Sequence, residues 1–192
     1  MKVIFLDIDG VISTFESEWK LDINKLELLS KLIQETDAKT VISSSWRVGC
    51  YTIEDMKNHF SSFRLDDSVK YSDEFKVFLN SIVGLTPCGS QNGVLRGNEI
   101  QDWIDNNDNI ESYVILDDDS DMLESQLFNF VQTDTYEGLT EREVKLCKLI
   151  LNNKKVVNPI RLNFTLRNEW LNNCNGFQKT NILKRLKNYN NI

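Results

Sequence analysis

The feature that most constrains the fold is a short apolar run near the start of the chain that ends in two carboxylates. Residues 3–10 read VIFLDIDG, which suits a strand in the middle of a sheet until Asp7 and Asp9 are reached. Burying even one unpaired carboxylate is costly, so two of them at one strand end need a joint purpose. Side chains two residues apart on a strand project to the same side, so Asp7 and Asp9 can both face one ligand.

Apolar segments of strand length alternate with amphipathic segments of helical length over the first 151 residues. Thr52 and Asp55 are spaced as a capping box for a helix through His59, and Thr140 and Glu143 are spaced as another. Because strand–helix–strand connections are right-handed, the alternation predicts a parallel sheet covered on both faces, a doubly wound α/β fold. Strands are expected over residues 2–8, 39–43, 81–85, 113–116 and 128–132, and further helices over residues 24–35, 98–105 and about 140–151.

In such a sheet, ligands bind beyond the carboxyl ends of the central strands. Three polar clusters fall at those ends: Asp7 with Asp9, the serines at 43–45, and the aspartates at 117–119. If the first and fourth strands are neighbours, Asp117 joins Asp7 and Asp9, and close carboxylates raise one another's pKa. A divalent cation removes this conflict, and oxygen ligands in a chain with one histidine favour Mg²⁺ over Zn²⁺. The alternative interpretation is that these are solvated loop aspartates.

Composition argues against several classes of protein. The first apolar run stops at Asp7, too early for a secretory signal, and no apolar stretch approaches the roughly 20 residues of a membrane helix. The four cysteines stand far apart and form no CxxC pair, which indicates reduced thiols in the cytosol. We therefore expect a cytoplasmic protein that has no membrane partner. The oligomeric state is left open, with a monomer favoured.

The net charge of −7 is unevenly distributed along the chain. Residues 1–150 contain 14 basic and 28 acidic side chains, whereas residues 151–192 contain 8 basic side chains, one acidic side chain and several aromatic ones. This break predicts a main domain over residues 1–151 and a basic C-terminal extension over residues 152–192. The extension has two interpretations: a helical tail that docks on the acidic domain through Trp170, or a surface that binds nucleic-acid phosphates and stacks on bases.

Four segments, in order, resemble the motifs of the haloacid dehalogenase (HAD) superfamily. VIFLDIDGV at residues 3–11 resembles the first motif, a hydrophobic strand followed by DxDG, and VISSSWR at residues 41–47 resembles the second. Arg96, which opens RGNEIQDWI, fits the basic third motif, and YVILDDDSD at residues 113–121 fits the acidic fourth. The combination also resembles, more narrowly, the HAD domains of multidomain RNA-repair proteins. The resemblance covers about residues 2–135 and implies a Rossmann-like three-layer sandwich around a central parallel sheet.

The resemblance implies that the chain is a phosphatase that works through an aspartyl-phosphate. Asp7 would attack phosphorus in line, and Asp9 would protonate the leaving oxygen and then deprotonate the attacking water. Mg²⁺ would neutralise charge in the transition state. A general acid two residues after the nucleophile suits a phosphate-ester leaving group, so phosphatase chemistry is favoured over dehalogenation.

The same resemblance implies the ligands of phosphate and metal. Ser43, or Ser44 if the strand runs one residue longer, would donate a hydrogen bond to one phosphoryl oxygen, and Arg96 would hold another. Arg47 is a weaker candidate for the role of Arg96, and its ordinary interpretation is a surface arginine beside Trp46. The expected metal ligands are Asp7, Asp9, Asp117, Asp118 and Asp121.

The segments between the motifs, residues 10–39 and 45–96, are too short for a full cap domain. An open site suits a phosphate on a macromolecule, so a terminal phosphate of RNA or DNA is the leading substrate, ahead of a phosphoprotein or a small phosphomonoester. One alternative is a metal-dependent nuclease, which would need neither the strand-2 serine nor Arg96. Another is a non-catalytic phosphate-binding or receiver-like module, which usually carries its acceptor aspartate on a middle strand.

Overall fold

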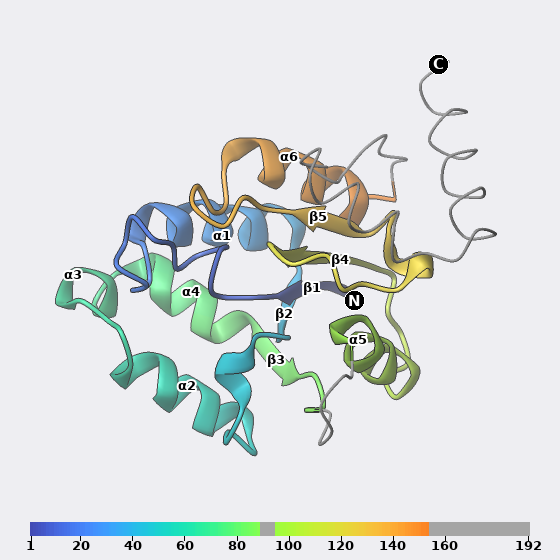
Figure 1. The fold of residues 1–192 in the computed structure, drawn as a ribbon, viewed down its shortest axis with the longest axis horizontal. Coiled ribbons are helices and arrows are strands. Elements are labelled where there is room, and N and C mark those ends of the chain that lie inside the picture. Colours follow the sequence, from blue (N-terminus) through green and yellow to red (C-terminus); the bar gives the residue numbers. More distant parts are fainter. Residues whose placement is uncertain (89–94, 154–192) are drawn as a thin grey trace. The chain divides into compact units, whose positions relative to one another are not determined.

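The computed structural model describes residues 1–88 and 95–153, which form a parallel sheet with helices on both faces (Figure 1). The strands are ordered β3-β2-β1-β4-β5, and every neighbouring pair is parallel. The expected α/β class is therefore confirmed, and each expected strand forms. Their bounds are β1 (Lys2–Leu6), β2 (Lys39–Ile42), β3 (Ile82–Leu85), β4 (Ser112–Asp117) and β5 (Phe130–Gln132).

The helices also follow the sequence pattern, and both predicted capping boxes are present, at Thr52 with Asp55 and at Thr140 with Glu143. The segment before β3, for which the sequence pattern gave no bounded element, forms two helices, α3 (Asp67–Lys70) and α4 (Asp73–Ser81). The helices are α1 (Ile23–Thr36), α2 (Ile53–Ser62), α3 (Asp67–Lys70), α4 (Asp73–Ser81), α5 (Arg96–Asp105) and α6 (Glu141–Leu151), with 3-10 turns at Ser45–Arg47 and Glu124–Gln126.

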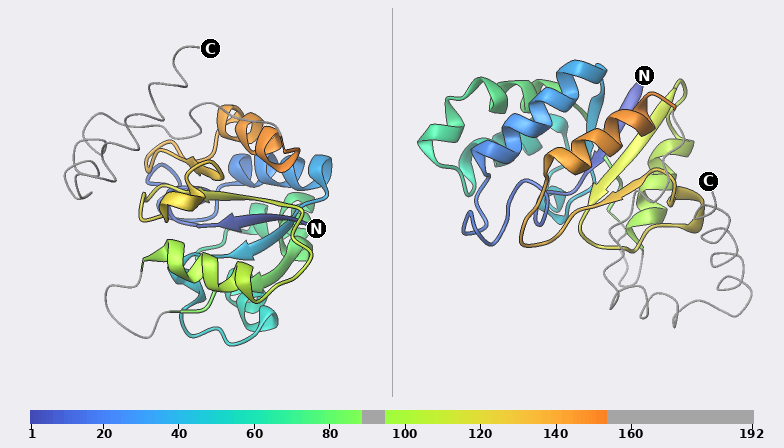
Figure 2. Two further views of the ribbon diagram at one scale, coloured as in Figure 1. Left: turned by 90° about the vertical axis from the view of Figure 1, so that its right-hand side faces the viewer. Right: turned by 90° about the horizontal axis from the view of Figure 1, so that it is seen from above.

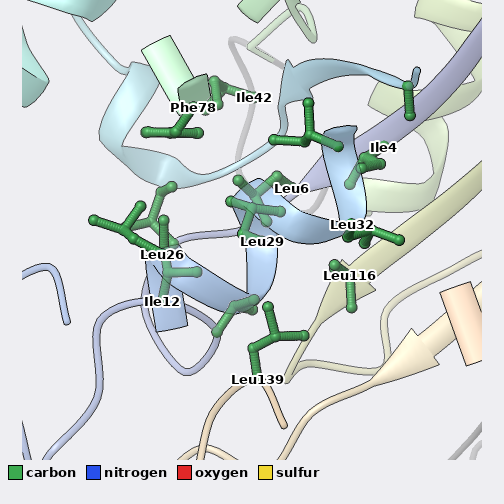
Figure 3. Packing of buried hydrophobic residues seen from close by; sticks show 14 of the residues in the cluster. Ile4, Leu6, Ile12, Leu26, Leu29, Leu32, Ile42, Phe78, Leu116 and Leu139 are labelled. Carbon is green, nitrogen blue, oxygen red and sulfur yellow. The ribbon is translucent and has the colours of Figure 1, made fainter. Parts of the chain in front are cut away.

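Side chains of β1 alternate between the two faces of the sheet, and both faces are buried, as expected for a parallel sheet. Ile4 and Leu6 pack with leucines of α1 and with Leu116 of β4 (Figure 3). On the opposite face, the ring of Phe5 meets Trp103 of α5 edge to face, with centroids 5.5 Å apart. Thus α1 and α6 cover one face and α5 covers the other, as the left view of Figure 2 shows.

The order of the strands determines where the polar clusters meet. β1 lies between β2 and β4, and the pairing continues one residue past its end. Asp7 N donates to Leu116 O at 2.9 Å, and Ser43 N donates to Leu6 O at 3.0 Å. The segments that follow these three strands therefore start at the same edge of the sheet, where this fold class binds its ligands.

The described residues between the motifs, 10–39 and 45–88, form no separate cap domain. Residues 10–22 form turns and loops after β1, and α2, α3 and α4 fill the connection from β2 to β3. The basic extension predicted for residues 152–192 lies outside the described residues from residue 154 onward, so the domain boundary stays a prediction.

Two features bear on the expected cellular setting. Within the described part of the chain, no helix is long and apolar enough to cross a membrane. The cysteines there are free thiols, at Cys50, Cys88 and Cys147. Neither feature tests the cytoplasmic location, which stays a prediction.

Candidate active site

Three carboxylates gather at the carboxyl ends of β1 and β4. Asp7, Asp117 and Asp118 each place one oxygen within 4.8 Å of the others, and the first two are buried. Gly10 makes room for this group: its φ is +72°, and a Cβ there would lie 2.3 Å from Cγ of Asp118. The expectation that β4 brings Asp117 to Asp7 is confirmed by the strand order. The donor set, oxygens only and closely spaced, fits Mg²⁺.

Arg96 binds two of these carboxylates from the first turn of α5. Its Nη1 lies 2.8 Å from Oδ1 of Asp7 and 2.8 Å from the carbonyl oxygen of Ser43, and its Nε lies 3.2 Å from Oδ2 of Asp117. Oδ2 of Asp121 accepts a hydrogen bond of 3.0 Å from the backbone N–H of Arg96. The side chain of Asp121 therefore anchors the start of α5, where its negative charge also complements the helix dipole.

Burial and mutual repulsion disturb the titration of the site. Burial raises the pKa of Asp7 from an ordinary 3.8 to about 6, although Arg96 and a hydrogen bond from Ser44 lower it. The pKa of Asp117 is raised well above its ordinary value by burial and by Asp7. Burial lowers the pKa of Arg96, but the carboxylates of Asp117, Asp7 and Asp121 outweigh it, so the net shift is upward. One arginine faces several acids, and this excess negative charge favours a bound cation.

The two serines that follow β2 have different surroundings. Both are buried, and the Ser44 hydroxyl accepts a hydrogen bond from Trp46 N at 3.3 Å while also interacting with Asp7. The Ser43 hydroxyl finds no hydrogen-bond partner among the described residues. A buried hydroxyl without a partner is costly, which is consistent with a role in holding a ligand oxygen. Ser43 therefore stays the favoured phosphate ligand of the two.

Asp9 lies beside the three-carboxylate group and has partners of its own. Its Oδ2 accepts a hydrogen bond of 2.8 Å from Nε1 of Trp46, and its Oδ1 accepts one of 3.1 Å from Oγ of Ser13. Nη1 of Arg64 lies 3.9 Å from the same Oδ1. The Asp9 side chain is 38% exposed, so a ligand at this edge of the sheet could reach it. The metal-ligand roles predicted for Asp9 and Asp121 stay predictions.

The interpretation of Arg47 as a surface arginine is wrong. Its exposure is 4%, and its guanidinium donates to the carbonyl oxygens of Ser44 at 2.6 Å and Thr86 at 3.0 Å. It also forms an ion pair with Glu99 of α5. Arg47 therefore braces the turn after β2 against β3 and α5, and its donors are occupied by the protein itself. Arg96 is the arginine that faces Asp7.

The structure adds site neighbours that the sequence pattern did not single out. Trp46 and Ser13 hold Asp9, and Thr135 donates a hydrogen bond of 2.7 Å to Oδ2 of Asp118. Arg64 reaches Asp9 from the connection between α2 and α3. Trp46, Arg64 and Thr135 act through contacts between separate segments of the chain, which no local spacing predicts, whereas Ser13 lies only four residues from Asp9.

Comparison with known proteins places this arrangement in a family. Searches of the curated proteins and of the solved structures found no significant match. A family model described as the HAD domain in Swiss Army Knife RNA repair proteins matches residues 3–144, which contain every residue of the site described above. The chain therefore belongs to the family of HAD domains in Swiss Army Knife RNA repair proteins.

Proposed function

We propose that the chain is a Mg²⁺-dependent phosphatase that hydrolyses phosphomonoesters through an aspartyl-phosphate on Asp7. The observation that carries the proposal is the environment of that carboxylate. Asp7 is buried in the group with Asp117 and Asp118, and Arg96 fixes its Oδ1 at 2.8 Å. A nucleophile held in place and shielded from bulk water loses little freedom on reaching the transition state.

Hydrolysis divides into two displacements at phosphorus. In the first, a carboxylate oxygen of Asp7 bonds to phosphorus as the ester oxygen leaves, and Asp9 gives that oxygen a proton. In the second, Asp9 takes a proton from water, whose oxygen displaces the Asp7 carboxylate and releases inorganic phosphate. Trp46 and Ser13 hold Asp9 at 2.8 and 3.1 Å, so it keeps one position through both transfers.

The phosphoryl oxygens need positive or donating partners. Arg96 and the Ser43 hydroxyl, with Ser44 as the alternative, are the groups of this chain that would bind them. Mg²⁺, when bound by Asp7, Asp117 and Asp118, would neutralise part of the charge that these oxygens carry. Asp118 is steadied for that role by its hydrogen bond from Thr135.

We propose further that the phosphate lies at the end of an RNA or DNA strand. The family carries the name of RNA repair proteins, and residues 10–88 form no large cap that would close over a small substrate. The 8 basic side chains of residues 151–192 would attract a polyanion that the acidic residues 1–150 repel. A phosphoprotein or a small phosphomonoester is the next candidate.

Hydrolysis of an aryl phosphate by Asp7→Asn tests the proposal. The wild type should hydrolyse the ester only when Mg²⁺ is present, and Asp7→Asn should fall to background, because the amide cannot act as the nucleophile. Asp102→Asn, an equal change at an exposed position on α5, serves as the control and should match the wild type. Activity of Asp7→Asn above about a tenth of the wild-type rate would contradict the assignment. Mg²⁺-dependent cleavage of an unphosphorylated oligonucleotide would instead indicate a nuclease.

A further inference from the structure

We infer that the surface beside Asp9, formed by His59, Phe63 and Arg64, is the subsite for the leaving group and that it takes the terminal nucleotide of a phosphorylated single strand. The inference rests on the proposed phosphatase function, because that function makes Asp9 the group that protonates the leaving oxygen. Whatever is attached to that oxygen must then lie next to Asp9. Among the described residues within reach of its carboxylate, Arg64 carries the positive charge.

Arg64 is placed to meet a negatively charged leaving group. Its Nη1 lies 3.9 Å from Oδ1 of Asp9, and its side chain remains 43% exposed. The exposed donors can bind a phosphodiester next to the scissile phosphate without leaving Asp9. The guanidinium carbon also lies 5.0 Å from the ring centroid of Phe63 and 5.9 Å from that of Trp46, within the range of cation–π attraction.

Aromatic rings beside Arg64 provide a surface on which a base can stack. His59 and Phe63 are stacked with centroids 4.8 Å apart, and Phe63 meets Trp46 edge to face at 5.1 Å. Trp46 is the residue that holds Asp9, so the aromatic cluster is continuous with the acid–base group. Phe63 is 39% exposed, so part of its side chain is open to a ligand.

The backbone fixes this surface next to the site. Arg64 has a φ of +49°, a conformation that a side-chain-bearing residue adopts only when its surroundings hold it. Its carbonyl oxygen accepts a hydrogen bond of 3.2 Å from Leu21 N, and its Nη1 lies 3.5 Å from the carbonyl oxygen of Trp19. The connection from α2 to α3 is therefore tied to the loop that follows Asp9, and the subsite does not depend on a closing motion.

The pairing of a cation with aromatic rings favours a nucleotide over a phosphopeptide. Single-stranded RNA is recognised by stacking unstacked bases on aromatic rings or on the plane of an arginine, while charged groups hold the backbone phosphates. A peptide leaving group offers neither an obligatory ring nor a regular second charge. The chemistry of His59, Phe63 and Arg64 therefore matches a base together with its adjoining phosphate.

The test measures binding separately from turnover. Full-length protein with Asp7→Asn is titrated into a labelled single-stranded oligonucleotide whose 5′ or 3′ end carries phosphate, and fluorescence anisotropy gives the Kd. Adding Arg64→Gln should weaken binding about tenfold. The slope of the logarithm of the binding constant against the logarithm of the salt concentration should become shallower by about 0.7. Arg64→Lys should keep the slope, because it keeps the charge. Lys145→Gln, which removes an exposed charge from α6, should match the parent protein.

Phe63→Leu tests the stacking half of the inference. It should weaken binding by about fivefold or more for an end that carries a base, and by much less for an end with an abasic nucleotide. The subsite is refuted if Arg64→Gln and Phe63→Leu bind the oligonucleotide as tightly as the parent protein does. It is also refuted if both substitutions weaken the binding of a phosphopeptide as much as they weaken the binding of the oligonucleotide. The proposed function fails on a different result, the absence of Mg²⁺-dependent aryl phosphatase activity in the wild type.

Discussion

Nε1 of Trp46 donates a hydrogen bond of 2.8 Å to Oδ2 of Asp9, and this contact joins the segment after β2 to the segment after β1. The two residues are 37 positions apart in sequence. Trp46 is itself packed among the rings of His59, Phe60 and Phe63, so the indole has little freedom to move. Asp9 is thus held by a rigid donor, which is what an acid–base group needs to meet its substrate at one distance.

Trp46→Phe should test this positioning. The variant keeps a ring in the cluster but removes the N–H, so Asp9 should lose its fixed orientation. We expect hydrolysis of an alkyl phosphate to fall by about tenfold or more, because its poor leaving group needs the proton. An activated aryl phosphate should lose less. Equal losses on both esters, or a melting temperature that falls in proportion to activity, would assign Trp46 a structural role only.

Asp9→Asn should also lose more activity on an alkyl phosphate than on an activated aryl phosphate, and the difference should be larger than for Trp46→Phe. The nucleophile remains, but no group is left to protonate the ester oxygen, so the loss on an alkyl phosphate should be about 10²–10⁴-fold. The loss on an activated aryl phosphate should be clearly smaller. Steady-state kcat/KM for the two esters gives the comparison, and identical ratios would exclude the acid–base role of Asp9.

Mg²⁺ should stabilise the protein more at neutral pH than in acid. Because the pKa of Asp7 rises from 3.8 to about 6 on folding, the folded state binds this proton more tightly, and metal-free stability falls as the pH rises through that window. Mg²⁺ binds the deprotonated group, so its effect on the melting temperature should be small near about pH 5 and full above about pH 7. Thermal melts with and without Mg²⁺ measure this. Asp117→Asn should lose most of the increase; an equal increase at both pH values would contradict the metal site.

Arg47 should be more important for stability than for catalysis. Arg47→Met would remove the buried ion pair with Glu99 and the side-chain hydrogen bond to the carbonyl oxygen of Thr86. Removing one partner of a buried pair costs about 3–5 kcal/mol, which urea denaturation would measure. Lys145→Met, at an exposed position on α6, is the control. A loss below about 1 kcal/mol is typical of a surface site and would contradict the bracing role.

The basic extension should supply affinity for a polyanionic substrate. Removing residues 154–192 leaves every described element intact, so aryl phosphatase activity and the melting temperature should change little. The oligonucleotide KM should rise, and its salt dependence should flatten by about 0.7 for each lost phosphate contact on a single strand. If the melting temperature and both activities fall together, the extension is structural and the nucleic-acid interpretation loses its main support.

Local patterns were enough to predict the strands and most of the helices, although they gave no bounds for α3 and α4. The apolar spacing of α1, the capping boxes of α2 and α6 and the apolar runs of β1 and β4 each depend on residues a few positions apart. The polar clusters were found in the same way, because they directly follow those runs. Strand ends were less certain: β1 stops at Leu6, so Asp9 lies in the turn beyond the strand and is fixed by Ser13 and Trp46 instead.

The sequence by itself determined which side chains are available to the site, and the tertiary structure decided what each of them contacts. The position of β1 between β2 and β4 brings Asp117 to Asp7, and a different strand order would separate them. Arg47 and Arg96 were both candidates to face the phosphate. The packing of α5 against the turn after β2 decides between them, because it pairs Arg47 with Glu99 and Arg96 with Asp7. The reason is physical: periodicity reports which face of an element is apolar, whereas a contact between distant segments depends on how whole elements pack together.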